Sequence, residues 1–145
     1  MKQATTYDLA VCGGGHAGIE ASLIAAHFGC SVSLITLDVN AIGRMSCNPA
    51  IGGLAKGQIV REIDVLGGIM GVAADYAGIQ FKILNQSKGK SVWSPRAQVD
   101  KRKYERFVSD AIRENKNISI ISGEVVDVLI SGGVLAGVIL RDGST

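Results

Sequence analysis

The sequence lacks any apolar run long enough to cross a bilayer. No segment approaches the roughly 18 consecutive apolar residues that a membrane-spanning helix requires, and we therefore expect no membrane span. The start, MKQATTYD, is polar, and the apolar run after it is too short for a signal peptide. These two absences favour a cytoplasmic protein.

Cysteine is scarce as well. Cys12, Cys30 and Cys47 are odd in number and widely spaced, so they form neither a C-x-x-C pair nor an obvious disulfide framework. This usage favours a reducing compartment, and we expect no metal site. Glycine, in contrast, is abundant: nine of the 19 glycines fall in one triplet and three pairs at loop-like places, which does not indicate disorder. With 145 residues, the chain is long enough for one domain with a core.

One glycine cluster lies between a strand-like run and a helix-like run. Leu9 to Cys12 is short and apolar, and Gly13, Gly15 and Gly18 after it match G-x-G-x-x-G. In this motif the first glycine allows a tight turn, the second lets the backbone approach a pyrophosphate, and the third lets the helix pack closely on the strand. The pyrophosphate lies at the helix N-terminus, where free N–H groups and the helix dipole favour an anion. The pattern predicts a dinucleotide site; the alternative is a plain glycine-rich turn.

The residues after the cluster complete a βαβ unit. A helix is predicted over 17–28, with Gly29 as its C-cap, and a buried strand over 32–36. This succession is the start of a parallel, doubly wound sheet. The acid that usually binds a ribose hydroxyl is missing, because Thr36 occupies its position and the first carboxylate is Asp38. Whether Thr36 makes a neutral contact or Asp38 reaches back is left open.

The remaining elements are predicted from periodicity and turn signals. Residues 38–57 exceed the usual length of a connection in an α/β unit and predict an ordered, functional loop. Residues 69–80 are ambiguous. The other predicted elements are a helix over 59–66 with Ile59, Ile63 and Leu66 at core spacing, a short strand over 81–84, an amphipathic helix over 103–114, a parallel strand over 118–121, and a hairpin of 125–130 and 134–140 around a glycine turn.

Positive charge gathers in residues 81–106. This segment holds eight lysines and arginines against Asp100 and Glu105, a local balance of +6 in a chain whose total is +2, so the other residues sum to −4. The segment is either a solvated face or a surface for an anionic partner, with Trp93 available for stacking.

Four stretches together are similar to one family. They are GGGHAGIEA at 13–21, MSCNPAIGG at 45–53 followed by Lys56 and Gly57, GIQF at 78–81, and RAQ at 96–98. The general plan resembles FAD-binding domains of the glutathione-reductase type. The stretches resemble the tRNA uridine 5-carboxymethylaminomethyl modification enzymes, also called the glucose-inhibited division protein A family. The similarity covers nearly the whole chain, although Lys90 stands where the family usually has proline.

The resemblance implies an α/β, Rossmann-like FAD-binding domain with a parallel sheet and a β-meander. Family members are several times longer, so residues 1–145 are expected to be an incomplete, N-terminal part of that domain. The family enzyme uses FAD, with NADH and methylenetetrahydrofolate as co-substrates. It adds a carboxymethylaminomethyl or aminomethyl group to carbon-5 of the wobble uridine of tRNA. It acts as a homodimer together with a GTPase partner.

The resemblance also assigns roles by position. FAD would be bound by the turn residues Gly13, Gly14, Gly15, His16, Ala17 and Gly18, by Thr36, by the loop residues Asn48, Pro49, Ala50, Ile51, Gly52 and Gly53, and by the main chain of Val125 at the adenine. Contacts with tRNA, folate or flavin are expected from Lys56, Lys88, Arg96, Lys101 and Lys103.

Cys47 and Arg96 are the candidate catalytic residues. Cys47 is a candidate nucleophile toward uridine carbon-6, although no base partner is visible in the sequence and a free cysteine is usually a buried spectator. Arg96 is a candidate for orienting flavin or folate. For His16, the alternative to cofactor binding is that it simply fills a turn position.

Three other functions are left open. A folate- and FAD-dependent tRNA uridine methyltransferase shares the FAD domain, but its loops differ from the CNPAIGG stretch. A flavin disulfide reductase requires a redox cysteine pair after the second strand, whereas Cys47 stands alone. A non-catalytic nucleotide-binding module is the third.

Overall fold

The computed structural model describes residues 6–145, which form two compact units. The first unit comprises the residues up to Ile42 together with 112–145, and the second comprises 43–111. Within the described range, no helix is both long and apolar enough to cross a membrane.

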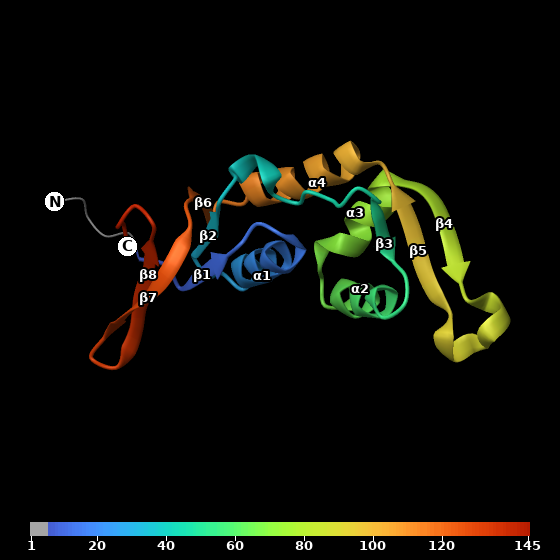
Figure 1. The fold of residues 1–145 in the computed structure, drawn as a ribbon, viewed down its shortest axis with the longest axis horizontal. Helices are drawn as coiled ribbons and strands as arrows, with labels where there is room; N and C mark the ends of the chain where they lie inside the picture. Colours follow the sequence, from blue (N-terminus) through green and yellow to red (C-terminus); the bar gives the residue numbers. More distant parts are fainter. Residues whose placement is uncertain (1–5) are drawn as a thin grey trace. The chain divides into compact units, whose positions relative to one another are not determined.

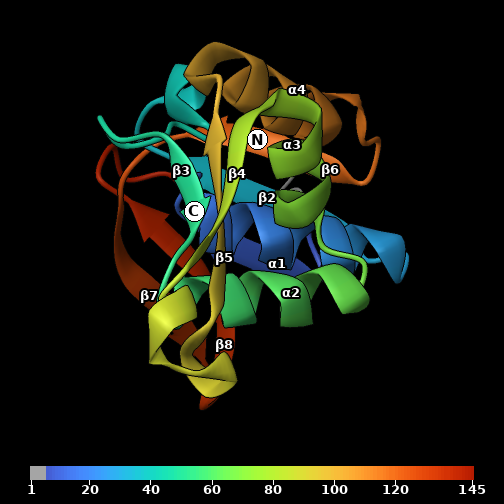
Figure 2. The same ribbon diagram turned by 90° about the vertical axis from the view of Figure 1, so that its right-hand side faces the viewer.

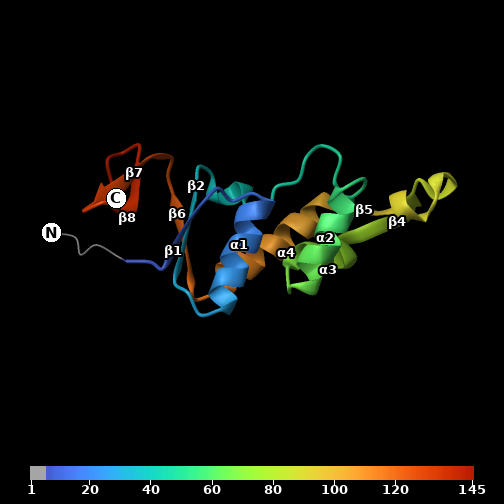
Figure 3. The ribbon, with the colours of Figure 1, turned by 90° about the horizontal axis from the view of Figure 1, so that it is seen from below.

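The first unit is built on a parallel three-stranded sheet. Strand β1 (Leu9–Cys12) pairs with β2 (Val32–Thr36), and β2 pairs with β6 (Ile118–Ser122), which gives the order β1-β2-β6. All five residues of β2 are buried. Helix α1 (His16–His27) contacts all three strands and lies against one face of the sheet (Figure 3). The predicted α/β fold with a parallel sheet is confirmed.

Helix α1 buries a narrow face of small and branched side chains. Ile19, Ser22 and Ala26 recur at helical spacing and are buried. The helix ends at His27 with Phe28 as its C-cap, and Gly29 follows with a φ of +85°, a left-handed conformation that glycine adopts at little cost. After β2, the short 3₁₀ helix η1 (Val39–Ala41) is capped by the carboxylate of Asp38, which accepts a hydrogen bond from the Asn40 N–H.

The predicted hairpin is also present in the first unit. Strand β7 (Val125–Ser131) pairs antiparallel with β8 (Val134–Leu140) in a sheet of their own, drawn in orange to red in Figure 1. The Arg141 guanidinium donates two hydrogen bonds to the Glu124 carboxylate and closes the open end of the hairpin. Glu124 has a lowered pKa because of this hydrogen bonding to Arg141.

The second unit is an antiparallel sheet with helices on one face. Strands β3 (Ala50–Gly52), β5 (Ser94–Val99) and β4 (Gly78–Leu84) lie side by side in that order (Figure 2). Helices α2 (Lys56–Val65) and α3 (Ile69–Ala77) pack on each other and lie to one side of the strands in Figure 1. The 3₁₀ helices η2 (Gln86–Lys88) and η3 (Lys90–Val92) connect β4 to β5.

Three sequence predictions between β2 and α4 need correction. The loop over 38–57 is interrupted by η1 and by strand β3, and α2 begins at Lys56 rather than Ile59. The core spacing assigned to this helix is wrong, because Ile59 and Leu66 are exposed while Gly57 and Val60 are buried. Strand β5 was not predicted, because its Pro95 and Arg96 interrupt any apolar pattern.

The amphipathic helix α4 (Lys101–Glu114) follows β5 and confirms the predicted periodicity. Tyr104, Val108 and Ile112 recur every four residues, and each has at most 1% of its surface exposed. In the second unit, Val108 packs against Gly43, and Phe107 stacks on Tyr76 of α3 with ring centroids 4.9 Å apart.

Truncating the buried face of α1 should destabilise the chain. Ile19 is 1% exposed, so Ile19→Ala leaves a cavity and should lower the free energy of unfolding by about 2–5 kcal/mol. Ile24, on the same helix, is 36% exposed, and Ile24→Ala is the matched control with a much smaller expected cost. Urea unfolding of both variants measures the difference. Equal losses would contradict the assignment of Ile19 to the core.

Candidate functional site

The glycine turn joins β1 to α1 and leaves open space above its middle glycine. Gly13 has a φ of +109°, and its N–H continues the strand by donating to the Ile35 carbonyl. Gly15 is the N-cap of α1, no side chain caps it, and a Cβ built on it meets no atom within 4 Å. The first amides of a helix have no acceptor within the helix itself. The turn therefore offers backbone donors and room beside them, as an anion requires.

The other two glycines are required by close packing. A Cβ on Gly18 would overlap the carbonyl oxygen of Gly13, so the helix can approach the strand this closely only without a side chain. A Cβ on Gly14 would lie 3.1 Å from side-chain atoms of both Thr36 and Ile42. The close-packing role predicted for Gly18 agrees with this geometry.

Thr36 and Asp38, the two candidates for the ribose contact, lie in different surroundings. Thr36 ends β2, is buried, and has its side chain directly beside Gly14 of the turn. Asp38 is exposed, and its carboxylate caps η1. His16 is half-buried at the first position of α1, and Val125 is half-buried at the first position of β7.

The loop before β3 belongs to the second unit and exposes its thiol. Ser46, Cys47 and Asn48 are exposed, and the Ser46 hydroxyl donates to the Asn48 carbonyl at 3.2 Å. Cys47 is thus not a buried spectator. Gly52 and Gly53, which end the loop's short strand, both have a φ of +102°. A Cβ on Gly52 would overlap the Pro95 carbonyl, whereas one on Gly53 would meet nothing within 4 Å.

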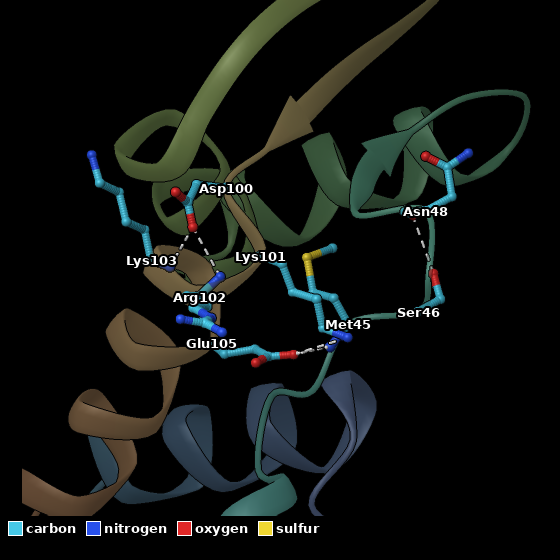
Figure 4. A network of polar contacts seen from close by, with 8 residues as sticks. All are labelled: Met45, Ser46, Asn48, Asp100, Lys101, Arg102, Lys103 and Glu105. Carbon is cyan, nitrogen blue, oxygen red and sulfur yellow. Dashed lines mark hydrogen bonds and ion pairs between the residues drawn. The ribbon is translucent and has the colours of Figure 1, made fainter.

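The first turn of α4 concentrates three cations at a helix N-terminus. Lys101, Arg102 and Lys103 lie where the helix dipole already disfavours positive charge. Asp100 offsets this: its carboxylate accepts the backbone N–H groups of Arg102 at 2.9 Å and Lys103 at 3.0 Å, as Figure 4 shows. The capping role of Asp100 was not predicted, although an aspartate directly before a helical pattern is a known start signal.

A second carboxylate ties this turn to the Cys47 loop. Glu105 accepts the backbone N–H of Met45 at 2.8 Å, and its Oε1 lies 3.9 Å from the Lys101 ammonium (Figure 4). Lys101 is therefore partly neutralised, whereas the exposed Lys103 forms no side-chain ion pair within residues 6–145. Of the two lysines assigned to tRNA, Lys103 carries the more available charge.

The other predicted cations lie at separate places in the second unit. Lys56 is the first residue of α2, and Lys88 is exposed at the end of η2. Arg96 is half-buried in β5, where its register partner on β4 is Lys82. Trp93 donates its indole N–H to the Gln86 carbonyl at 3.2 Å and so fastens the β4–β5 connection.

Comparison with known proteins identifies sequence relatives across nearly the whole chain. The family model described as "Glucose inhibited division protein A" matches residues 8–145. The tRNA uridine 5-carboxymethylaminomethyl modification enzyme MnmG of Aquifex aeolicus is 52% identical over 132 residues, which are 91% of this chain and 21% of that relative. The chain thus spans about a fifth of the length of the curated relatives that it matches.

Solved structures that resemble the chain include a close sequence relative and more distant proteins. The form I crystal structure of Aquifex aeolicus GidA is 50% identical, covers 97% of this chain with 23% of its own, and has a TM-score of 0.89. PqsL of Pseudomonas aeruginosa, described as a probable FAD-dependent monooxygenase, covers 95% of this chain with 39% of its own. Its TM-score is 0.62 at 14% identity, a likeness of fold alone.

The cap of α4 should make stability depend on pH. Hydrogen bonding from the Lys103 backbone, with a further contribution from Arg102, holds the pKa of Asp100 below its usual value of 3.8. The ionised cap therefore stabilises the fold at pH values above about 4, and this contribution is lost as the pH falls through the lowered pKa.

Asp100→Asn should accordingly have a lower Tm than the unchanged chain at neutral pH. This difference in Tm should become smaller as the pH is lowered. Asp110→Asn, an exposed position on the same helix, is the matched control. Thermal unfolding followed by circular dichroism between pH 2 and pH 7 provides the comparison, over a range set by the carboxylate pKa values. A gap that stays constant across this range would show that the charge of Asp100 does not stabilise the helix.

Proposed function

The chain belongs to the glucose-inhibited division protein A family, and from this we propose that it forms part of an FAD-dependent tRNA-modifying enzyme. The proposed reaction adds a carboxymethylaminomethyl or aminomethyl group to carbon-5 of the wobble uridine. Methylenetetrahydrofolate and NADH are the proposed co-substrates, and a GTPase partner and a homodimer complete the assembly. The observation that carries the proposal is a sequence identity of about 50% to enzymes named for this modification, over more than nine tenths of the chain.

The glycine turn is the proposed FAD pyrophosphate site. Its fit rests on the open space at Gly15 and on the uncapped N-terminus of the twelve-residue helix α1. Thr36, rather than Asp38, is proposed to contact the ribose, because its side chain lies beside the turn while Asp38 caps η1. Gly13 to Gly18 would hold the phosphates, and the main chain of Val125 would contact the adenine.

The second unit is the proposed source of contacts near the reacting groups. The loop Asn48 to Gly53 would line the isoalloxazine, and bound FAD supplies the redox chemistry of the reaction. The exposed thiol of Cys47 stays a candidate nucleophile toward uridine carbon-6, since a nucleophile must be accessible to its substrate. Arg96 stays a candidate for orienting flavin or folate.

The cationic first turn of α4 is proposed to contact tRNA phosphates. Three cations at the positive end of a helix repel one another and the helix dipole, and Asp100 and Glu105 offset only part of this cost, which a bound anion would reduce further. Lys56 and Lys88 are proposed to extend the same kind of contact. Because phosphate contacts release counterions, this binding should weaken steeply with salt.

Replacing the middle glycine should remove the cofactor without unfolding the turn. Gly15 has a φ of −80° and a ψ of 178°, a conformation that valine adopts readily. The valine side chain would fill the space proposed for the pyrophosphate, so a full-length protein with Gly15→Val should retain no FAD. Flavin absorbance per protein measures this. Gly137→Val is the matched control, because a Cβ there also meets nothing within 4 Å. If Gly15→Val had the same flavin absorbance per protein as the control, Gly15 would not be part of the FAD site.

Neutralising the free lysine of α4 should reduce the salt dependence of tRNA binding. Lys103→Gln should lower the slope of log affinity against log salt by about one, for one lost phosphate contact. Lys101→Gln should lower it by less, because Glu105 already lies near that ammonium. Lys116→Gln, an exposed cation outside the basic segment, is the control. Filter binding over a salt series gives the slopes, and an unchanged slope for Lys103→Gln would leave these charges as a solvated face.

A further inference from the structure

Four polar side chains form a compact array on the paired strands β4 and β5. The register places Gln80 opposite Gln98 and Lys82 opposite Arg96. Residues two apart on a strand share a face, so all four side chains project from the same side of the sheet. We call these four residues the polar grid. A cavity of about 250 Å³ is lined by the grid together with Leu84.

The grid has a cavity of its own beside a larger one that the helices line. The larger cavity, of about 350 Å³, is lined by Phe81 and Ile83 of β4 and by residues of α2 and α3, and Lys82 and Arg96 also border it. The cavity at the grid is lined by strand residues alone. The two cations therefore border both cavities, whereas the amides of Gln80 and Gln98 line only the smaller one.

The two cations of the grid are not neutralised within the described residues. Like charges directly opposite each other on neighbouring strands destabilise a sheet. Neither Lys82 nor Arg96 forms a side-chain hydrogen bond or an ion pair within residues 6–145. Arg96 is half-buried, so its charge is also less well hydrated than that of a fully exposed side chain. An anion between the two cations would turn this repulsion into attraction.

Strand β3 adds no side chain beside Arg96. Its register partner there is Gly52. A Cβ on Gly52 would overlap the Pro95 carbonyl, so β3 packs closely against β5 at this point.

We propose that the polar grid binds an anionic group, a phosphate or a carboxylate, between Arg96 and Lys82. The planar guanidinium donates two parallel N–H groups to such an anion, and the ammonium adds a point charge. The side-chain amides of Gln80 and Gln98 donate to the remaining oxygens. This site holds independently of the FAD turn, which belongs to the other unit.

The test is a titration of the full-length, FAD-loaded protein with small anions at constant ionic strength. Inorganic phosphate and dimethyl phosphate represent phosphate sources, glutarate represents a carboxylate source, and chloride is the reference. At least one of the three probes should raise the Tm above the chloride value. The probe that binds most tightly identifies the source.

Charge-removing variants locate the binding. Arg96→Gln and Lys82→Gln should each weaken the anion about tenfold or more, because each removes a charged hydrogen-bond donor. Lys116→Gln should stay within about twofold of the unchanged protein, because it removes the same charge outside the grid. The proposal is overturned if no probe exceeds chloride, or if the response survives in both grid variants.

A second test introduces a carboxylate into the grid instead of removing a cation. Gln98→Glu places an anion beside Arg96, so it should raise the Tm without added anion and abolish the response to the probes. Gln86→Glu adds the same charge in η2, outside the grid, and should leave the response intact. A Gln98→Glu protein that is destabilised, or that still responds fully to phosphate and glutarate, would contradict an anion site between the two cations.

Discussion

The path of the backbone from β1 into α1 is the constraint on which the first unit depends. The helix can lie against the sheet only because Gly18 has no side chain to meet the Gly13 carbonyl, and because Gly13 adopts a φ of +109°. This close approach places Ile19 and Ser22 in the core and aims the first turn of α1 past the end of β1. The same packing that stabilises the unit thus leaves the open space at Gly15 that we propose for the pyrophosphate.

The second unit meets a different constraint, which is to hold several cations close together. At the start of α4, Asp100 accepts two backbone amides and Glu105 lies near Lys101, so acidic side chains partly compensate the charge. On the sheet, no acidic side chain within residues 6–145 forms an ion pair with Lys82 or Arg96. The two places therefore differ physically: one is a capped helix end facing solvent, and the other is an uncompensated pair above a cavity.

Local sequence patterns were sufficient to predict the helices and strands that have strong short-range signals. The glycine motif, the β-branched run of β2 and the four-residue recurrence of Tyr104, Val108 and Ile112 each gave the correct element. The failures occurred where a strand is held by its partners rather than by its own pattern. Strand β5 contains Pro95 and Arg96, and β3 is only three residues long with a terminal glycine, so only pairing makes them strands. The buried face of α2 was misjudged for the same reason. Gly57 packs against Ser94 and Pro95 of β5, and Ile59 is therefore exposed.

The sequence by itself determined the parallel fold, the dinucleotide turn and the family, because these depend on glycine spacing and on a contiguous stretch of specific residues. Only the tertiary structure decided which side chains meet. It placed Thr36 beside the turn and Asp38 at a cap, bound Glu105 to the Met45 amide, and set Lys82 opposite Arg96. Each of these contacts joins residues that depend on strand register or helix packing, and a shift of one residue in register would move every side chain to the other face.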